Sequence, residues 1–336
     1  MNSIDKIIEK IKQSFLFYLF LSSKELFHTN FWFWLSILNP QETIKLFSDK
    51  NINGNLTFKR EHNQSNGKQR SKVDLLISSN NVPCVVIENK IKDFPKVEQL
   101  LRIKNSFDKI IPDFILATLF WTEDFVLNGW NVRTYKDISN KIEPNKFTEI
   151  RYYKDLIYDY KQFTKSLASL SELLEINDKY DFAISFKKDL YNKLNEIKLW
   201  EGYQKLRASH LLYHFNSTNI HHLKTNYSIH HQKATIDFEM NLKNEYKLGI
   251  EIEDNQYRKY VKGHHAKQFA ENLIKNNIFL FAIKERKNKP YLNYGEHFKY
   301  QYDKIEKIPF SNLFDRINNE FSDIKIIIDK IEKQIP

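Results

Sequence analysis

Two acidic residues and a lysine stand close together in one short stretch of the chain. Asp74 lies before the pair Asn80-Asn81, while Glu88 and Lys90 follow it. Carboxylate oxygens are ligands that Mg²⁺ prefers, and one or two of them suffice beside water and phosphate oxygens. A lysine at such a site can orient or help deprotonate the attacking water and offset charge on the phosphate. These residue types are the minimum set for hydrolysing a phosphodiester, with Mg²⁺ or Mn²⁺ as cofactor.

The sequence around these residues predicts an antiparallel hairpin. Val73–Ser78 and Pro83–Ile91 are apolar runs of β type, and Asn80-Asn81 between them is a turn signal. We therefore expect two neighbouring strands that are joined by a tight turn.

The hairpin would bring the three reactive side chains together. Because side chains alternate along a strand, Glu88 and Lys90 share one face, and Asp74 takes the polar face of the first strand. The backbone carbonyl of Asn89 is the expected further metal ligand, beside Asp74 and Glu88. Charged groups in such apolar strands are costly unless they are paired or bind a metal. A surface ion pair of Lys90 with Glu88 or Asp74 is the structural alternative.

Helices and further strands are predicted around the hairpin. A helix precedes it, capped by Ser22 or Ser23 and ending before Pro40, and a second helix follows it. This order predicts an α/β fold with a mixed central sheet flanked by helices, one of them a crossover helix. The expected elements are an amphipathic helix over 3–21, helices Lys24–Leu38 and Pro95–Phe107, and a third strand Asp113–Trp121.

The pattern Asp74…Glu88-Asn89-Lys90 resembles the PD-(D/E)xK nuclease superfamily, and the sequence from Ile87 to Ile91 is similar to its uncharacterised bacterial branches. The resemblance covers roughly residues 20–121. It implies a restriction-endonuclease-like core, catalytic roles for Asp74, Glu88 and Lys90, and a setting in bacterial defence, restriction or repair.

Two flanking residues extend the resemblance. It implies that Glu25, on the first helix, reaches the metal site, and that Gln99, on the helix after the hairpin, assists catalysis. From the residues alone, Glu25 could equally be a solvated acid on a helix without a role at the site. Gln99 could equally be an amide that caps or packs a helix. The chain departs from the family's pattern at Val73, a common and harmless replacement of proline, and at Ile103, where some branches carry an aromatic residue.

The charge of the chain favours a polyanionic partner. The 336 residues carry a formal net charge of +10, and each lysine or arginine placed on a phosphate releases counterions. Arg70, Lys72, Lys92 and Lys96 border the predicted site and are candidates for binding nucleic acid, with generic surface residues as the alternative. We expect DNA rather than RNA as the substrate. The sequence leaves a homodimer and a regulatory partner open.

Cysteine usage and hydropathy exclude several classes of protein. Cys84 is the only cysteine, so an intramolecular disulfide and a cysteine-based zinc cluster are excluded. The apolar stretch over residues 15–21 is far shorter than the ~20 residues that a membrane span requires. These features predict a cytoplasmic protein that does not insert into a membrane.

We expect three parts along the chain: a nuclease core over 1–165, a helical connector over 166–199, and a C-terminal α/β module over 200–336. The C-terminal module contains a second pair of acids, Asp237 and Glu251, spaced as Asp74 and Glu88 are, with Glu253 at the position of the lysine. A helix around Ala266–Asn276 and a strand Ile278–Ile283 are predicted to follow. This module is either a degenerate second copy of the core or an ordinary α/β module with a similar order of elements.

Two functions other than a nuclease stay open. The chain could be a catalytically silent nucleic-acid-binding module on the same fold, in which the acids are structural. It could also be a protein-interaction scaffold. Cleavage of nucleic acid that requires Lys90 would distinguish a nuclease from the binding module and from the scaffold.

Overall fold

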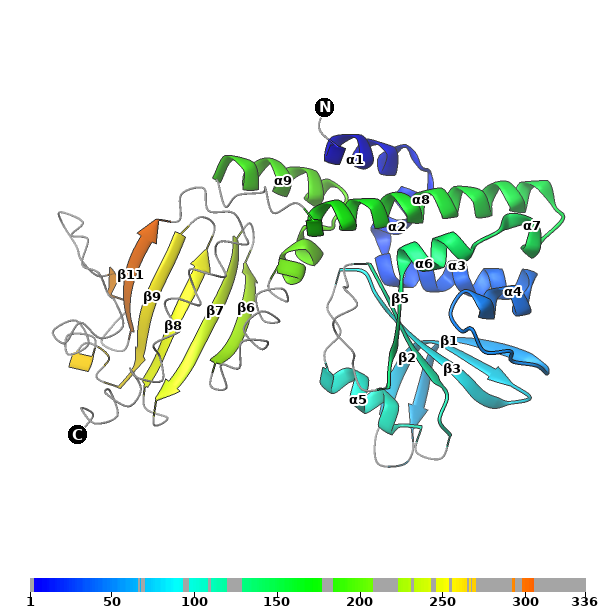
Figure 1. Cartoon of the computed structure of the whole chain (residues 1–336), viewed down its shortest axis with the longest axis horizontal. Coiled ribbons are helices and arrows are strands. Elements are labelled where there is room, and N and C mark those ends of the chain that lie inside the picture. The colour runs from blue at the N-terminus through cyan, green and yellow to red at the C-terminus, as the bar shows by residue number, and fades with distance from the viewer. Residues whose placement is uncertain are drawn as a thin grey trace. The chain divides into compact units, whose positions relative to one another are not determined.

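The computed structural model describes residues 3–65, 67, 70–92, 97–107, 110–119, 129–176, 184–207, 223–230, 233–242, 246–253, 256–264, 266, 268–269, 292–293 and 298–304. The chain divides into two compact units (Figure 1). The first comprises Met1–Ile176 and Lys193–Leu206, and the second comprises Asn177–Asn192 and Arg207–Pro336. Residues 200–206, which we assigned from sequence to the C-terminal module, thus belong with the first unit.

The first unit is built on a five-stranded mixed sheet in the order β1-β2-β3-β4-β5. β1, β2 and β3 pair antiparallel, whereas β4 runs parallel to β3 and β5 parallel to β4. The predicted α/β class with a mixed sheet flanked by helices is therefore confirmed. The strands are β1 (Leu56–Ser65), β2 (Arg70–Ser79), β3 (Val82–Lys90), β4 (Asp113–Thr118) and β5 (Asn131–Thr134).

The turn between β2 and β3 is the one that the sequence predicts. Asn80 and Asn81 have φ angles of 49° and 65°, in the left-handed region that asparagine tolerates better than most residues. Two consecutive residues of this kind suit the twist of a tight hairpin. The turn starts the pairing, and a register shift between Ile77 and Ser78 then sets Leu75 opposite Ile87, next to the acids.

Helices cover both faces of this sheet, and α8 packs outside α6 in Figure 1. The crossover helix α5 joins β3 to β4, while α3 contacts β1, β2 and β3. The helices of the first unit are α1 (Ser3–Gln13), α2 (Leu16–Ser22), α3 (Lys24–Leu38), α4 (Pro40–Lys45), α5 (Val97–Asn105), α6 (Tyr135–Lys141), α7 (Pro144–Phe147) and α8 (Arg151–Ile176). A further helical segment over 200–207 belongs to this unit up to Leu206.

The helix boundaries largely follow local sequence signals. α3 spans the predicted Lys24–Leu38, and Asn39 then caps α4 by accepting a hydrogen bond from the backbone N–H of Glu42 at 3.2 Å. Pro40 occupies the first turn of α4, where its missing N–H is not needed. The single helix predicted over 3–21 is wrong, because the helix is interrupted at 14–15 and forms α1 and α2.

The crossover helix is held to the sheet by an apolar cluster. Leu100, Ile103 and the following Phe107 pack with side chains of β2, β3 and β4. Burial of such side chains is the main favourable contribution to folding. Packing of this face fixes the position of Gln99, the residue before Leu100.

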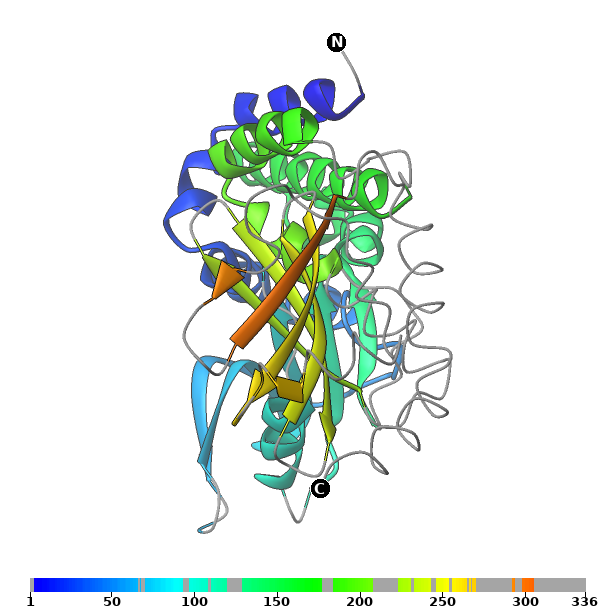
Figure 2. The same ribbon diagram turned by 90° about the vertical axis from the view of Figure 1, so that its left-hand side faces the viewer.

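The second unit contains a six-stranded sheet in the order β10-β11-β9-β8-β7-β6, whose pairings are all antiparallel. Figure 2 shows the twist of its strands. They are β6 (Leu223–His230), β7 (Lys233–Leu242), β8 (Tyr246–Glu253), β9 (Gln256–Gly263), β10 (Leu292–Asn293) and β11 (Phe298–Lys304). The helix α9 (Ile184–Glu196) carries the chain from the second unit back to the first.

The structure does not confirm that this unit repeats the first. The register pairs Asp237 with Glu251, as the register of β2 and β3 sets Asp74 opposite Glu88. However, β9 begins three residues after the last residue of β8 and runs antiparallel to it, whereas β3 leads into a helix and a parallel strand. Of the predicted helix 266–276 only residues 266 and 268–269 are described, and the strand 278–283 lies outside the described residues.

Among the described residues, no helix is long and apolar enough to cross a membrane. The apolar stretch over residues 15–21, which is too short for a membrane span, comprises Phe15 and most of α2. Leu16, Phe17 and Phe20 of this stretch are buried, whereas Phe15, Tyr18 and Leu19 are exposed.

Candidate active site

Asp74 and Glu88 lie on neighbouring strands at the end of the hairpin away from its turn. Leu75 pairs with Ile87, so the antiparallel register sets Asp74 across from Glu88. The Asp74 Oδ2 atom also accepts a hydrogen bond of 2.7 Å from the backbone N–H of Asn89. This bond fixes the first acid against the strand that carries the second.

Glu88 is the centre of the site. Its side chain is buried, and its Oε1 atom accepts a hydrogen bond of 2.6 Å from Gln99 Nε2. The same oxygen lies 2.8 Å from Lys90 Nζ, an ion pair whose two side chains are 3% and 12% exposed. The other oxygen, Oε2, is buried and has no hydrogen-bond partner within the described part of the chain. Such an atom is an unused acceptor with two lone pairs.

The electrostatics of the three residues reflect their burial. Burial, reinforced by the charge of Asp74, raises the pKa of Glu88 to about 7. Burial also raises the pKa of Asp74, although the N–H of Asn89 and the charge of Lys90 oppose the rise. Burial lowers the pKa of Lys90, but the charge and the hydrogen bond of Glu88 outweigh it, so the net pKa lies above its usual value. The lysine therefore stays charged beside two acids that repel each other.

Glu25 reaches the same end of β3 from α3. Its Oε1 atom accepts a hydrogen bond of 3.4 Å from the backbone N–H of Ile91, and its charge opposes ionisation of Glu88. Across the described ranges, no group of three or more His, Cys, Asp or Glu side chains is arranged to hold a metal ion. A cation at this site would therefore be held by Asp74 and Glu88, with its remaining ligands from backbone, water or substrate.

The side chain of Asn89 has a structural role. It points to the face opposite Glu88, where its Nδ2 atom donates to the backbone carbonyl of Glu25 at 2.9 Å and its Oδ1 atom accepts from the Tyr135 hydroxyl at 2.7 Å. Asn89 and Tyr135 are both buried. The amide thus ties β3 to α3 and to α6, and only its backbone carbonyl is left for the predicted ligand role.

Tyr135 is a residue of this site that the sequence analysis missed. It lies far along the chain from the hairpin and belongs to no recognisable motif. Only its position at the start of α6, directly after β5, brings its hydroxyl to Asn89.

The predicted nucleic-acid-binding residues have different surroundings. Lys72 is exposed and lies 2.5 Å from Glu61, while its charge lowers the pKa of Asp74. Arg70 is exposed at the start of β2. Lys92 lies 3.5 Å from Glu201, and Lys96 falls outside the described residues.

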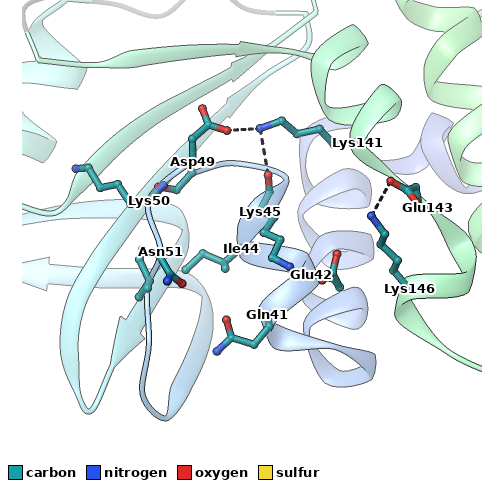
Figure 3. A pocket seen from close by; sticks show the side chains of 12 residues that line it. Gln41, Glu42, Ile44, Lys45, Asp49, Lys50, Asn51, Lys141, Glu143 and Lys146 are labelled. Carbon is teal, nitrogen blue, oxygen red and sulfur yellow. Dashed lines mark hydrogen bonds and ion pairs between the residues drawn. The ribbon is translucent and has the colours of Figure 1, made fainter.

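A separate hollow of about 490 Å³ lies beside α4 (Figure 3). None of the predicted site residues lines it. Its four lysines each form an ion pair with an acid, so it offers no clear excess of charge to a ligand. It is lined by Gln41, Glu42, Ile44, Lys45, Ser48, Asp49, Lys50, Asn51, Ile52, Lys141, Glu143 and Lys146.

The acids on β7 and β8 of the second unit lie in a different environment. Glu239 and Glu251 are buried, and Lys247 Nζ lies 3.3 Å from Glu239. Burial and the charges of Asp237 and Glu239 raise the pKa of the Tyr260 hydroxyl on the neighbouring strand. The acids of this sheet thus lie beside a tyrosine, where the first site has Lys90 and Gln99.

Comparisons of the chain with protein-family models, curated proteins and solved structures find no match. The chemistry therefore rests on the geometry of the first unit. Asp74 and Glu88 offer carboxylate oxygens at one point, Lys90 supplies a fixed positive charge, and Gln99 holds one oxygen of Glu88. Such a set can bind a divalent cation and act on an anionic substrate.

Proposed function

We propose that the protein is a metal-dependent nuclease of the PD-(D/E)xK type, which hydrolyses phosphodiester bonds in nucleic acid, with DNA as the favoured substrate. The observation that carries the proposal is the buried cluster of Asp74, Glu88 and Lys90 at the open end of one hairpin. Burial of two repelling carboxylates beside one lysine is costly, and a function that needs them together accounts for it.

The site residues fit a divalent cation. The Oε2 atom of Glu88 is a buried acceptor without a donor, and Asp74 lies across the strand pair from it. Asp74 and Glu88 would hold Mg²⁺ or Mn²⁺, with the Asn89 carbonyl as a further ligand. Bound there, the ion would supply Lewis-acid polarisation of the phosphate and relieve the repulsion between the two acids.

The protein's own residues would orient the attacking water and hold the metal ligands in place. Lys90, held 2.8 Å from Glu88 and charged at neutral pH, would orient the attacking water and offset charge on the phosphate. Gln99 would hold Glu88 in a single orientation, and Asn89 would hold β3 against α3. Glu25 would adjust the charge of the site from the end of α3.

A second candidate function follows from the ion pair itself. Lys90 and Glu88 already neutralise each other in the structure, as they would in a binding module that does not cleave. A nucleic-acid-binding protein on this fold would retain the basic residues and bind with a strong salt dependence. The nuclease would cleave nucleic acid and would need Lys90 to do so, whereas the binding module would not cleave.

The test is a cleavage assay on purified protein. Supercoiled plasmid, single-stranded DNA and RNA are each incubated with Mg²⁺, Mn²⁺ or EDTA. We expect cleavage with a divalent metal and none in EDTA. Lys90→Ala should lower the rate by about 100-fold or more, since it removes a group that acts directly on the reacting atoms.

The matched control is Lys154→Ala, which removes a lysine on α8 that is paired with the exposed Glu149 before that helix. This variant should cleave as the wild type does. Inactivity of the wild type on all three substrates with every metal would overturn the proposal. Equal rates for Lys90→Ala and wild type would overturn it as well, and salt-sensitive binding without cleavage would support the binding module.

A further inference from the structure

A lysine far along the chain lies beside the candidate active site. Lys205 belongs to the helical segment 200–207, and residues up to Leu206 are part of the first compact unit. Its side chain is 13% exposed, and its Nζ atom lies 3.0 Å from Glu201 Oε1, one helical turn earlier. An ammonium group that is largely withdrawn from water needs an anion nearby.

Glu201 connects this lysine to the catalytic strand. Its other oxygen, Oε2, lies 3.5 Å from Nζ of Lys92, two residues after Lys90. Glu201 therefore forms ion pairs with two lysines, one just after β3 and one from the 200–207 segment. Its own side chain is 44% exposed, whereas Lys205 is nearly covered.

Several lysines lie near Glu201. Burial lowers the pKa of Lys205, and the positive charges of Lys92 and Lys90 lower it further, whereas the charge of Glu25 opposes the change. Burial and the charge of Lys92 likewise lower the pKa of Lys24 at the start of α3. These lysines repel one another, so a further anion beside them would be stabilised.

A phosphate of nucleic acid is an anion that could bind beside these lysines. The acids Asp74 and Glu88 would by themselves repel a polyanion, and lysines next to them offset that repulsion. A phosphate can accept hydrogen bonds from two ammonium groups at once, and Glu201 here forms ion pairs with two of them. Exchange of the carboxylate for a phosphate would leave the local charge unchanged.

On the basis of the proposed nuclease function, we propose that Lys205 and Lys92 form a phosphate-binding site for the substrate strand, and that Glu201 is the counter-ion that the phosphate displaces. Glu201 is half-exposed, so water can solvate its carboxylate once a phosphate has taken its place beside the covered Lys205. The second half of the chain would thus supply a residue to the site of the first unit.

Binding of labelled nucleic acid tests the proposal. A short fluorescein-labelled DNA duplex and its RNA counterpart are titrated with full-length protein in Ca²⁺, over a series of salt concentrations. Lys205→Ala should weaken binding and reduce the slope of log Kd against log salt by about one. Glu201→Gln should tighten binding and leave that slope unchanged, because it removes the competing charge and no phosphate contact.

Two further variants serve as controls. Lys154→Ala and Glu149→Gln each remove one charge of the ion pair between α8 and the residues before it, and both should bind as the wild type does. Circular dichroism and thermal melting check the fold of each variant. If Lys205→Ala unfolds, Lys205→Gln, which keeps most of the apolar stem, replaces it.

The outcomes separate this inference from the proposed function. Wild-type protein that binds and cleaves, with Lys205→Ala and Lys205→Gln unchanged in affinity and salt slope, would overturn the inference and leave the nuclease standing. Weaker binding by Glu201→Gln would also overturn it, since Glu201 would then support binding. A wild-type protein that neither binds nor cleaves would overturn the proposed function itself.

Discussion

Gln99 Nε2 donates a hydrogen bond of 2.6 Å to Glu88 Oε1, which joins the crossover helix to the strand of the candidate active site. Gln99 is followed by Leu100, and Leu100 and Ile103 are buried against the sheet. The amide is therefore held by apolar packing on its own helix. A buried carboxylate with a fixed donor on one oxygen keeps the other oxygen in a defined direction.

Gln99→Ala should lower cleavage and weaken metal binding by about 10- to 100-fold, because Glu88 loses the partner that orients it. The measurement is the Mg²⁺ concentration needed for half-maximal cleavage, together with the maximal rate. Arg102→Ala, an exposed position on the same helix, is the control. An unchanged Mg²⁺ requirement in Gln99→Ala would show that the bond does not position Glu88.

Tyr135→Phe should destabilise the fold by about 1–3 kcal/mol, since it leaves the buried Oδ1 atom of Asn89 without its donor. Urea unfolding followed by circular dichroism gives the free energy of unfolding. Tyr152→Phe, at a side chain that is 70% exposed, should have almost no effect. Equal losses in the two variants would argue against a special role for the network of Asn89.

The stability of the metal-free protein should depend on Glu88 and on pH. The pKa of Glu88 is raised from 4.5 to about 7 in the folded state, so the folded protein holds a proton that the unfolded chain releases. The stability that this bound proton contributes is fully present below the pKa of Glu88 in the unfolded chain. It is lost as the pH rises through the pKa of Glu88 in the folded protein. The loss is at most about 3 kcal/mol.

Unfolding in urea at about pH 5 and about pH 8 measures this effect. Glu88→Gln, which cannot ionise, should lose less stability between the two conditions than the wild type. It should also be the more stable of the two at the higher pH. A pH dependence that is identical in both proteins would contradict the assignment of the raised pKa to Glu88.

Mg²⁺ should stabilise the protein more at high pH than at low pH. Ligand carboxylates must lose their protons to bind a metal, and a pKa of about 7 places that loss near neutrality. At a hundredfold excess over Kd the added stability is about 2.7 kcal/mol. Thermal melting at about pH 8 and about pH 6, with and without Mg²⁺, measures it. If Mg²⁺ raised the melting temperature of Asp74→Asn as much as that of the wild type, the metal would bind elsewhere.

The local elements of the first unit could be predicted because their signals are local. The turn at Asn80-Asn81, the end of α3 before Pro40 and the alternation along β3 depend on residues that are close in sequence. The break between α1 and α2 could not be predicted, since the apolar pattern continues through residues 14–15. The order of strands in the second unit was equally hidden, because antiparallel and crossover connections share the same strand patterns.

The sequence by itself determined which residues could do chemistry: two carboxylates and a lysine whose period along the strands places them on one face. The tertiary structure decided what surrounds them. It gave one oxygen of Glu88 to Gln99 and Lys90, used the side chain of Asn89 to bind α3 and α6, and brought Lys205 beside Lys92 through Glu201. The physical reason is that hydrogen bonds and charges act over a few ångströms in space, whatever the separation along the chain.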